Sequence, residues 1–565
     1  MASRNSSPTT DTTNRPAYRQ LLLFNGEGDC LAAKLRPGNV HNAGAARFRD
    51  GVESNGGLGA GPRRQRASLE RKTGLFPKGS GGMIAHLRDK MEIPLNIATL
   101  SAIVVIGGCL RVAHLGQKSY SWLELCTVRI CGLPFSSFCA LLWQFEANMS
   151  FYYLLVRLWI KFGDGEAWLR LLSVIFAIAS IPVIYAIGKR VSGNSTGLAA
   201  ALILSVNAAH VAYAQEARSY ALLMLLCLLS LLFFLRMAEF GASNAFAYAL
   251  VSALAVYAQF FAVFFLFAQW TSTYWLRRDV LSWKKFLSPI LLTAIFIAPA
   301  LSYMIFRHSG QLTWVRPTQL KDLSGSIYFL AADSGRFHKA LAILYLLCFA
   351  TAVRHVFLRW QLKPSSVQNW GTIVVIHCAV LPIVVTFSLS FWKPMFEMRY
   401  LLMCLPPLVV LVAQGLMEVR PAWLRLGVYA LIVGLSAGSL SWYYAQPNDG
   451  WRPLTAYLVQ HAQARDVIVI CPPIADWPIQ YYSAKTASPN GQRLTYVSPD
   501  TLLKDVQSHQ LSGKPLSNVS FWMVDWGDSP DADNIQREIL NEYTRLDQQQ
   551  FPRSLTLTHY ANSGE

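Results

Sequence analysis

The sequence has few charged residues for its length. Charged side chains make up 15% of its 565 residues, whereas soluble globular proteins hold about 25%. Apolar residues reach 53%, and the mean hydropathy is +0.30. These values exclude a chain of several ordinary soluble domains and predict a protein that crosses the membrane many times.

Cysteine is also scarce, with 10 residues in the whole chain. A disulfide scaffold is therefore excluded, although a disulfide among Cys126, Cys131 and Cys139 is left open. These cysteines lack the spacing with histidine that a zinc site requires. The sequence has no dinucleotide signature, Walker A loop or HExxH motif, so it is not expected to drive transport with ATP by itself.

Aromatic residues and positive charge are abundant. The 17 Trp, 23 Tyr and 30 Phe exclude disorder as the dominant state. The formal net charge is +18, and many basic residues lie beside apolar runs or in the N-terminal segment. Contact with anionic membrane lipids explains this distribution better than nucleic-acid binding, which is not expected.

Apolar runs predict a polytopic helical membrane protein with about 11 transmembrane helices. The two runs between 244 and 276 are nearly continuous, so their boundary is the least clear. The predicted spans are 94–115, 167–188, 196–213, 220–236, 244–259, 260–276, 286–306, 339–357, 370–391, 400–417 and 425–442.

The segments outside the spans differ in character. Residues 1–90 are rich in Gly, Ser, Asn and Arg and predict a disordered basic tail. Residues 91–442 form the transmembrane domain, in which residues 116–166 are a long first external loop with interfacial, Trp- and Tyr-rich helices. Residues 443–565 contain predicted strands at 466–471, 519–525 and 554–558, which indicate a small external α/β domain.

Basic residues in short loops predict the orientation of the chain. Lys189-Arg190, Arg277-Arg278 and Arg420 fall in loops that share one side, which the positive-inside rule makes cytoplasmic. An odd number of spans then leaves the N-terminus in the cytoplasm. The C-terminal domain is expected on the periplasmic, or extracytoplasmic, side of the cytoplasmic (inner) membrane.

Five segments on the predicted outer side place polar or aromatic residues at the membrane boundary, where ionisable groups are candidates for function. Structural roles are an alternative for each: Glu124 as a solvated carboxylate, Arg399 reaching to the headgroups, and Trp314 as an interfacial anchor. His210 is expected to be a packed residue and not a metal ligand. The candidates are Glu124, Glu146, Asn148, Tyr152, Tyr153, Gln215, Glu216, Arg218, Tyr220, Trp314, Arg399 and Tyr400.

Taken in order, these segments resemble glycosyltransferase family 39, of the glycosyltransferase C superfold. Protein O-mannosyltransferases and lipid A aminoarabinose transferases are of this kind. The resemblance covers roughly residues 94–480 and is most specific at 146–164, at the Gln-Glu-Ala-Arg sequence 215–218 and at 396–400.

The resemblance implies inverting transfer of a sugar from a polyprenyl-phosphate donor to an unknown hydroxyl acceptor on a lipid, glycan or protein. It implies a catalytic base, for which Glu124 and Glu146 are the candidates, and a raised pKa would suit Glu124 in its partly apolar loop. Arg218 and Arg399 would bind the donor phosphate. The remaining candidates would contact substrate. No cofactor is certain, and a divalent metal is left open because no ligand cluster indicates one.

The sequence departs from the family at one position. Family members carry an adjacent Asp-Glu pair in the first loop, and the Asp is taken as the base. Here the pair is Leu123-Glu124. This keeps a catalytically inactive homologue as an alternative, beside a transporter or flippase of lipid-linked sugars. The transporter explains the spans but needs no long loop with carboxylates, and no inverted repeat is seen.

Overall fold

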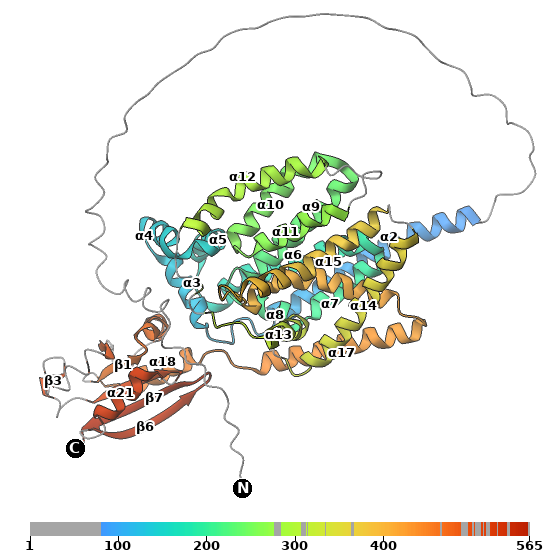
Figure 1. The fold of residues 1–565 in the computed structure, drawn as a ribbon. Helices are drawn as coiled ribbons and strands as arrows, with labels where there is room; N and C mark the ends of the chain where they lie inside the picture. The colour runs from blue at the N-terminus through green and yellow to red at the C-terminus, as the bar shows by residue number, and fades with distance from the viewer. Residues whose placement is uncertain are drawn as a thin grey trace, which may run out of the picture. The chain divides into compact units, whose positions relative to one another are not determined.

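The described part of the chain is a bundle of long helices and a small sheet-containing domain (Figure 1). The computed structural model describes residues 81–275, 284–306, 312, 315–333, 335–362, 366–463, 466–486, 495–499, 502, 510–511, 514–515, 520–527, 529–539 and 543–562. The predicted tail at residues 1–90 lies outside this set except for residues 81–90. Among the described residues, eight helices are long and apolar enough to span a membrane, or nine if one bent pair counts as a single span.

The elements of the membrane part follow the predicted runs closely. In chain order they are α2 (Gly81–Val112), α3 (Trp122–Gly132), α4 (Phe135–Leu141), η1 (Leu142–Glu146), η2 (Ala147–Met149), α5 (Ser150–Trp159), η3 (Ile160–Phe162), α6 (Glu166–Ser192), α7 (Asn194–Val206), α8 (Ala208–Ala214), α9 (Tyr220–Phe240), η4 (Gly241–Asn244), α10 (Ala245–Ala258), α11 (Ala262–Ser272), η5 (Thr273–Trp275), α12 (Lys284–Phe306), α13 (Leu320–Ala332), α14 (His338–Leu362), α15 (Val367–Leu389), η6 (Met398–Cys404), α16 (Leu405–Met417) and α17 (Ala422–Ala445).

The predicted spans at 244–259 and 260–276 depart from this pattern. They form α10, of 14 residues, and α11, of 11 residues, which are both shorter than a full span. Tyr248 near the start of α10 donates to Gln269 near the end of α11 at 2.9 Å and accepts from Trp270 at 2.8 Å. The two helices therefore run antiparallel as a helical hairpin with its tip at residues 259–261, and the count of eleven spans is not confirmed.

A buried arginine stabilises the bend of 60° between α7 and α8. The guanidinium of Arg111 donates to the carbonyls of Ser205 and Leu204, at 3.0 and 3.1 Å, and to Nδ1 of His210 at 2.7 Å. Asn207 caps α8 by accepting from the amide of His210 at 2.9 Å. The free backbone groups at the bend are thus bonded inside the protein, as a low-dielectric environment requires. His210 is packed, as expected.

The first loop consists of short helices, as the sequence predicts. Helix α3 begins with a capping box between Ser121 and Glu124. The cysteines Cys126, Cys131 and Cys139 are all free, so none of them forms a disulfide. Phe135, which begins α4, is largely exposed, and this agrees with the expected position of the loop at the membrane surface.

The C-terminal part contains the mixed sheet that the strand patterns indicate. Strand order is β2-β1-β5-β7-β6, with β1 parallel to β2 and β5, and β7 antiparallel to β5 and β6. The interior strand β1, between β2 and β5, is fully buried, as expected for a parallel strand covered on both faces. The elements are α18 (Trp451–His461), β1 (Val467–Cys471), η7 (Pro473–Ala475), α19 (Asp476–Ser483), β2 (Thr495–Val497), β3 (Gln510–Leu511), β4 (Lys514–Pro515), β5 (Phe521–Trp526), α21 (Pro530–Ile539), β6 (Tyr543–Phe551) and β7 (Leu555–Asn562).

The C-terminal domain contacts the first loop through hydrogen bonds. The hydroxyl of Tyr482 accepts from the amide of Tyr120 at 2.8 Å and donates to Glu166 at 2.9 Å. Asp449 accepts at Oδ2 from the amide of Trp122 at 3.0 Å, so it caps the start of α3. These contacts fit the prediction that the first loop and residues 443–565 lie on one side of the membrane.

Close helix packing makes one glycine critical for stability. A Cβ at Gly415 of α16 would lie 1.8 Å from the carbonyl oxygen of Cys348 in α14, whereas a Cβ at Gly434 of α17 would meet nothing within 4 Å. Gly415→Ala should therefore destabilise the protein by about 1–3 kcal/mol through overpacking. Thermal unfolding in detergent measures this. Gly434→Ala is the matched control, and equal midpoints for the two variants would contradict the packing argument.

Candidate functional site

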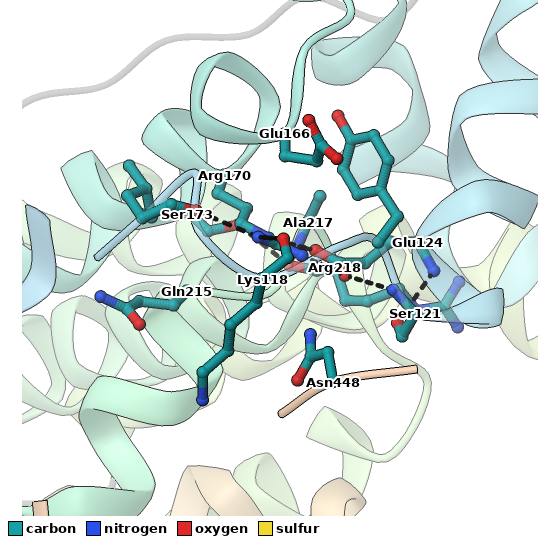
Figure 2. A network of polar contacts seen from close by, with 12 residues as sticks. Lys118, Ser121, Glu124, Glu166, Arg170, Ser173, Gln215, Ala217, Arg218 and Asn448 are labelled. Carbon is teal, nitrogen blue, oxygen red and sulfur yellow. Dashed lines mark hydrogen bonds and ion pairs between the residues drawn. The ribbon is translucent and has the colours of Figure 1, made fainter. Parts of the chain in front are cut away.

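Glu124 lies in a closed hydrogen-bond cluster at the start of α3 (Figure 2). Arg170 of α6 donates from Nε to Oε1 and from Nη2 to Oε2, both at 2.8 Å. The amides of Ala217 and Ser121 each donate to one carboxylate oxygen at 2.9 Å. Both charged side chains are buried. The cluster therefore joins α3, α6 and the turn after α8 through a bidentate ion pair.

Arg170 also fixes the chain that leads into α3. Its Nη1 donates to the carbonyls of Leu115 and Lys118 at 3.0 and 2.7 Å, and its Nη2 donates to that of Ser119 at 3.0 Å. A planar guanidinium with five donors suits this task, because it can bind a carboxylate and several carbonyls at once. Arg170 thus satisfies backbone groups that would otherwise be buried without partners.

The expectation of a raised pKa for Glu124 is wrong. Burial by itself would raise the pKa of this carboxyl, but the charge and hydrogen bonds of Arg170 and the two amide bonds hold it below its usual value. A carboxylate that accepts four hydrogen bonds has little capacity left to take a proton from a substrate. The structure thus favours a positioning role for Glu124.

Glu146 has more freedom than Glu124. It is the last residue of the short π-helix η1, and its side chain is partly exposed to solvent. Its Oε2 accepts from the hydroxyl of Tyr153 at 3.5 Å, which is a weak contact. Burial raises the pKa of Glu146, although the charge of Arg218 and the contact with Tyr153 oppose the shift. A carboxylate with a raised pKa and weak contacts is suited to accept a proton.

Arg218 shares the Tyr153 hydroxyl with Glu146. Its Nη1 donates to Tyr153 Oη at 3.4 Å, to Thr127 Oγ1 at 3.3 Å and to the carbonyl of Leu123 at 3.4 Å. These contacts are long, and the buried Nε has no hydrogen-bond partner among the described residues. The guanidinium therefore keeps donor capacity for an anion.

Glu216 lies under the influence of both predicted phosphate-binding arginines. Burial raises its pKa to about 7, and the charge of Glu124 adds to the shift, whereas Arg218 and Arg399 oppose it. Because both guanidiniums act on one carboxyl group, they belong to the same charged region. Arg399, at the start of η6, is also paired with Glu397 at 3.1 Å between Nε and Oε1.

Two predicted substrate-binding residues are engaged inside the protein. Gln215 donates from Nε2 to the carbonyls of Arg111 and Ala113, at 2.9 and 2.7 Å, and accepts at Oε1 from Tyr443 at 3.1 Å. The Tyr152 hydroxyl lies 3.2 Å from Ser173 Oγ and is fully buried. Both residues therefore support the fold at the site.

Two of the other predicted residues contact the hairpin tip. Asn148 accepts from the amide of Phe260 at 2.9 Å. The ring of Tyr400 packs against Phe261, with centroids 4.8 Å apart. Tyr220, the first residue of α9, is buried. Trp314 lies outside the described residues.

Three further residues at the site were not predicted from the sequence: Arg111, Arg170 and Asp449. The two arginines fall inside predicted apolar spans, and a charge there is itself a signal of a special role. Asp449 follows the last span and gives no such signal. No group of three or more His, Cys, Asp or Glu that could hold a metal ion occurs in the part of the chain that the structure describes.

Comparison with known proteins identifies the class of fold. Residues 150–313 match the model of the family described as dolichyl-phosphate-mannose-protein mannosyltransferase. The structure is similar to the apo crystal structure of ArnT from Cupriavidus metallidurans, with a TM-score of 0.52 and 10% identity over 84% of this chain and 98% of ArnT. The chain therefore shares the glycosyltransferase C type of fold with ArnT, and its resemblance to glycosyltransferase family 39 is confirmed over residues 150–313.

Two further solved structures match less closely. ArnT from the same organism, bound to undecaprenyl phosphate, gives a TM-score of 0.49 at 11% identity and covers 83% of this chain and 97% of ArnT. The oligosaccharyltransferase of Archaeoglobus fulgidus in complex with zinc and sulfate gives 0.45 at 12% identity, over 76% of this chain and 67% of that enzyme. No curated protein matches the chain.

Replacing Glu124 should destabilise the fold. Glu124→Gln leaves the buried Arg170 guanidinium without its counter-ion, and breaking such a pair costs about 3–5 kcal/mol.

The stability that Glu124 contributes should also depend on pH. Because the pKa of Glu124 is lowered in the folded protein, its contribution to the free energy of unfolding is present above the unfolded pKa and is lost as pH falls through the folded pKa. Thermal unfolding in detergent at neutral and acidic pH measures both effects. Glu146→Gln serves as the control and should change the midpoint little; equal losses in the two variants would contradict the assignment.

Proposed function

We propose that the protein transfers a sugar from a polyprenyl-phosphate donor to a hydroxyl acceptor, with inversion, at the outer face of the cytoplasmic membrane. The observation that supports this most is the Tyr153 hydroxyl, which donates to Glu146 at 3.5 Å and accepts from Arg218 at 3.4 Å. This arrangement places a guanidinium for a phosphate beside a carboxylate for a proton. Residues 443–565 form the external domain in this proposal.

The names of the similar proteins agree with a lipid-phosphate donor. The matching family is described by its use of dolichyl-phosphate mannose, and ArnT, whose apo form shares the fold, has been crystallised with undecaprenyl phosphate. A polyprenyl phosphate carries one anionic headgroup on a long apolar chain. A membrane-embedded bundle with arginines at its boundary suits such a ligand.

The arginines would stabilise the leaving group. In the reaction the bond between the anomeric carbon and the donor phosphate oxygen breaks, and negative charge grows on the phosphate. Bidentate guanidiniums match phosphate oxygens, and their effect is greatest where the charge develops. Arg218 fits this role because its contacts are long and its Nε is unpaired.

Glu146 is the base we favour. The acceptor oxygen forms the new bond to the anomeric carbon, and its proton passes to a carboxylate on the opposite side from the departing phosphate. Glu124 cannot take this proton without losing a hydrogen bond to Arg170 or to an amide. Glu146 has only a long contact at Oε2 and a raised pKa. Leu123, where the family carries Asp, leaves the inactive homologue as the second candidate.

Replacing the proposed base should abolish most turnover. Glu146→Gln is expected to lower kcat by about 10²–10⁴-fold, the usual contribution of a general base. The measurement is sugar transfer from a radiolabelled polyprenyl-phosphate sugar in liposomes.

The control is Glu239→Gln, which alters the Arg190–Glu239 pair at the far end of α6 and α9. It should retain near wild-type transfer. Unchanged turnover in Glu146→Gln would disprove the base assignment. If the wild type is inert and Leu123→Asp restores transfer, the inactive homologue is the correct interpretation.

Donor affinity should depend on pH through Glu216. Since its pKa is raised to about 7, the carboxyl becomes neutral as pH falls below 7 and stops competing with the phosphate for the two arginines. The donor KM should therefore fall between pH 8 and about pH 6. Measuring KM across this range in wild type and in Glu216→Gln tests the idea. If the donor KM of Glu216→Gln still changes with pH in the same way, a group other than Glu216 causes the pH dependence.

A further inference from the structure

The tip of the α10–α11 hairpin contacts three segments that carry the proposed site residues. The tip consists of Gln259, Phe260 and Phe261, between the end of α10 and the start of α11. In Figure 1, α10 and α11 lie among the central helices of the bundle. The tip is thus a single short element on which distant parts of the chain converge.

Each tip residue makes one of these contacts. Gln259 Oε1 accepts from Ser219 Oγ at 3.3 Å, and Ser219 directly follows Arg218. The amide of Phe260 donates to Asn148 Oδ1 at 2.9 Å, two residues after Glu146.

The third contact is apolar. The ring of Phe261 packs on Tyr400 with centroids 4.8 Å apart, and Tyr400 directly follows Arg399. The proposed base and both proposed phosphate ligands are therefore all within two residues of a tip contact.

Within the described part of the chain, the side-chain amide of Gln259 forms a hydrogen bond at its oxygen but not at its nitrogen. Its Nε2 is buried and has no hydrogen-bond partner among the described residues. Gln269 in the same hairpin is fully engaged: its Oε1 accepts from Tyr248 at 2.9 Å and from Ser230 at 3.2 Å, and its Nε2 donates to Ser230 at 3.1 Å. An unpaired buried donor lowers stability. For packing alone, an apolar side chain of similar size would serve better at position 259 than glutamine.

We propose that Gln259 is a positioning residue that holds the Ser219 turn, and through it Arg218, in place to bind the donor phosphate. The inference rests on the proposed function. It adds an element from the middle of the chain to a site otherwise built from the first loop, the 215–219 turn and η6. Small displacements of a charged ligand-binding group are enough to weaken binding.

The experiment compares Gln259→Met with Gln269→Met in the full-length protein. Both changes replace a buried amide by an apolar chain of similar length. The readouts are the thermal midpoint and the affinity for undecaprenyl phosphate in detergent micelles, followed by donor KM and kcat. Gln259→Met should keep or raise the midpoint and weaken undecaprenyl phosphate binding by about tenfold, with a rise in donor KM.

Gln269→Met should lower the midpoint, because it removes a satisfied network, and leave the affinity of the folded protein within about twofold of wild type. Wild-type affinity in Gln259→Met would overturn the inference. So would a loss of both the thermal midpoint and the affinity in Gln259→Met, because that result would show a packing role alone. If the wild type itself does not bind undecaprenyl phosphate, the proposed function fails, and the role of Gln259 fails with it.

Discussion

The site depends on the ion pair between Glu124 and Arg170. The pair is buried, bidentate and completed by two backbone amides. Two charges removed from water are tolerable only when their attraction and their hydrogen bonds are complete. Because the amide of Ala217 is one of the donors, Glu124 is one of the groups that hold the turn with Glu216 and Arg218. The ion pair therefore links the first loop to the 215–219 turn.

Polar groups near the membrane boundary fall into two kinds. Glu124, Arg170 and Gln215 have their hydrogen-bonding capacity used by the protein and act as internal supports. Glu146 and Arg218 have long contacts or an unpaired atom. In a low-dielectric region, a polar group whose hydrogen bonds are not all formed lowers stability. Such a group is therefore a better candidate for ligand binding than a group whose hydrogen bonds are all formed within the protein. Hydrogen bonding thus separates candidates for ligand binding from structural residues better than position in the sequence does.

Composition and periodicity were sufficient for most of the fold. The long apolar runs became helices, and the strand patterns at 466–471, 519–525 and 554–558 became β1, β5 and β7. The hairpin α10–α11 was less predictable, because continuous apolar sequence does not reveal where a chain reverses when the tip is Gln-Phe-Phe.

Individual roles at the site were harder to predict than the residues themselves. The pKa of Glu124 was predicted in the wrong direction because its partner Arg170 lies 46 residues away, and local sequence does not show such a pairing. Gln215 and Tyr152 are predicted to contact substrate from their place in a motif, and the structure adds hydrogen-bond partners from other parts of the chain that the motif does not show. Motifs in the sequence locate a site, whereas contacts in the folded protein determine which of its polar groups are free to bind a substrate.

The cap that Asp449 provides for α3 affects the order in which the protein can mature. The carboxylate lies 327 residues after the Trp122 amide that it accepts from. During synthesis, the first loop therefore emerges long before the residue that secures its leading helix. The Asp449 cap on α3 can therefore form only after the chain beyond α17 has been synthesised and lies against the first loop.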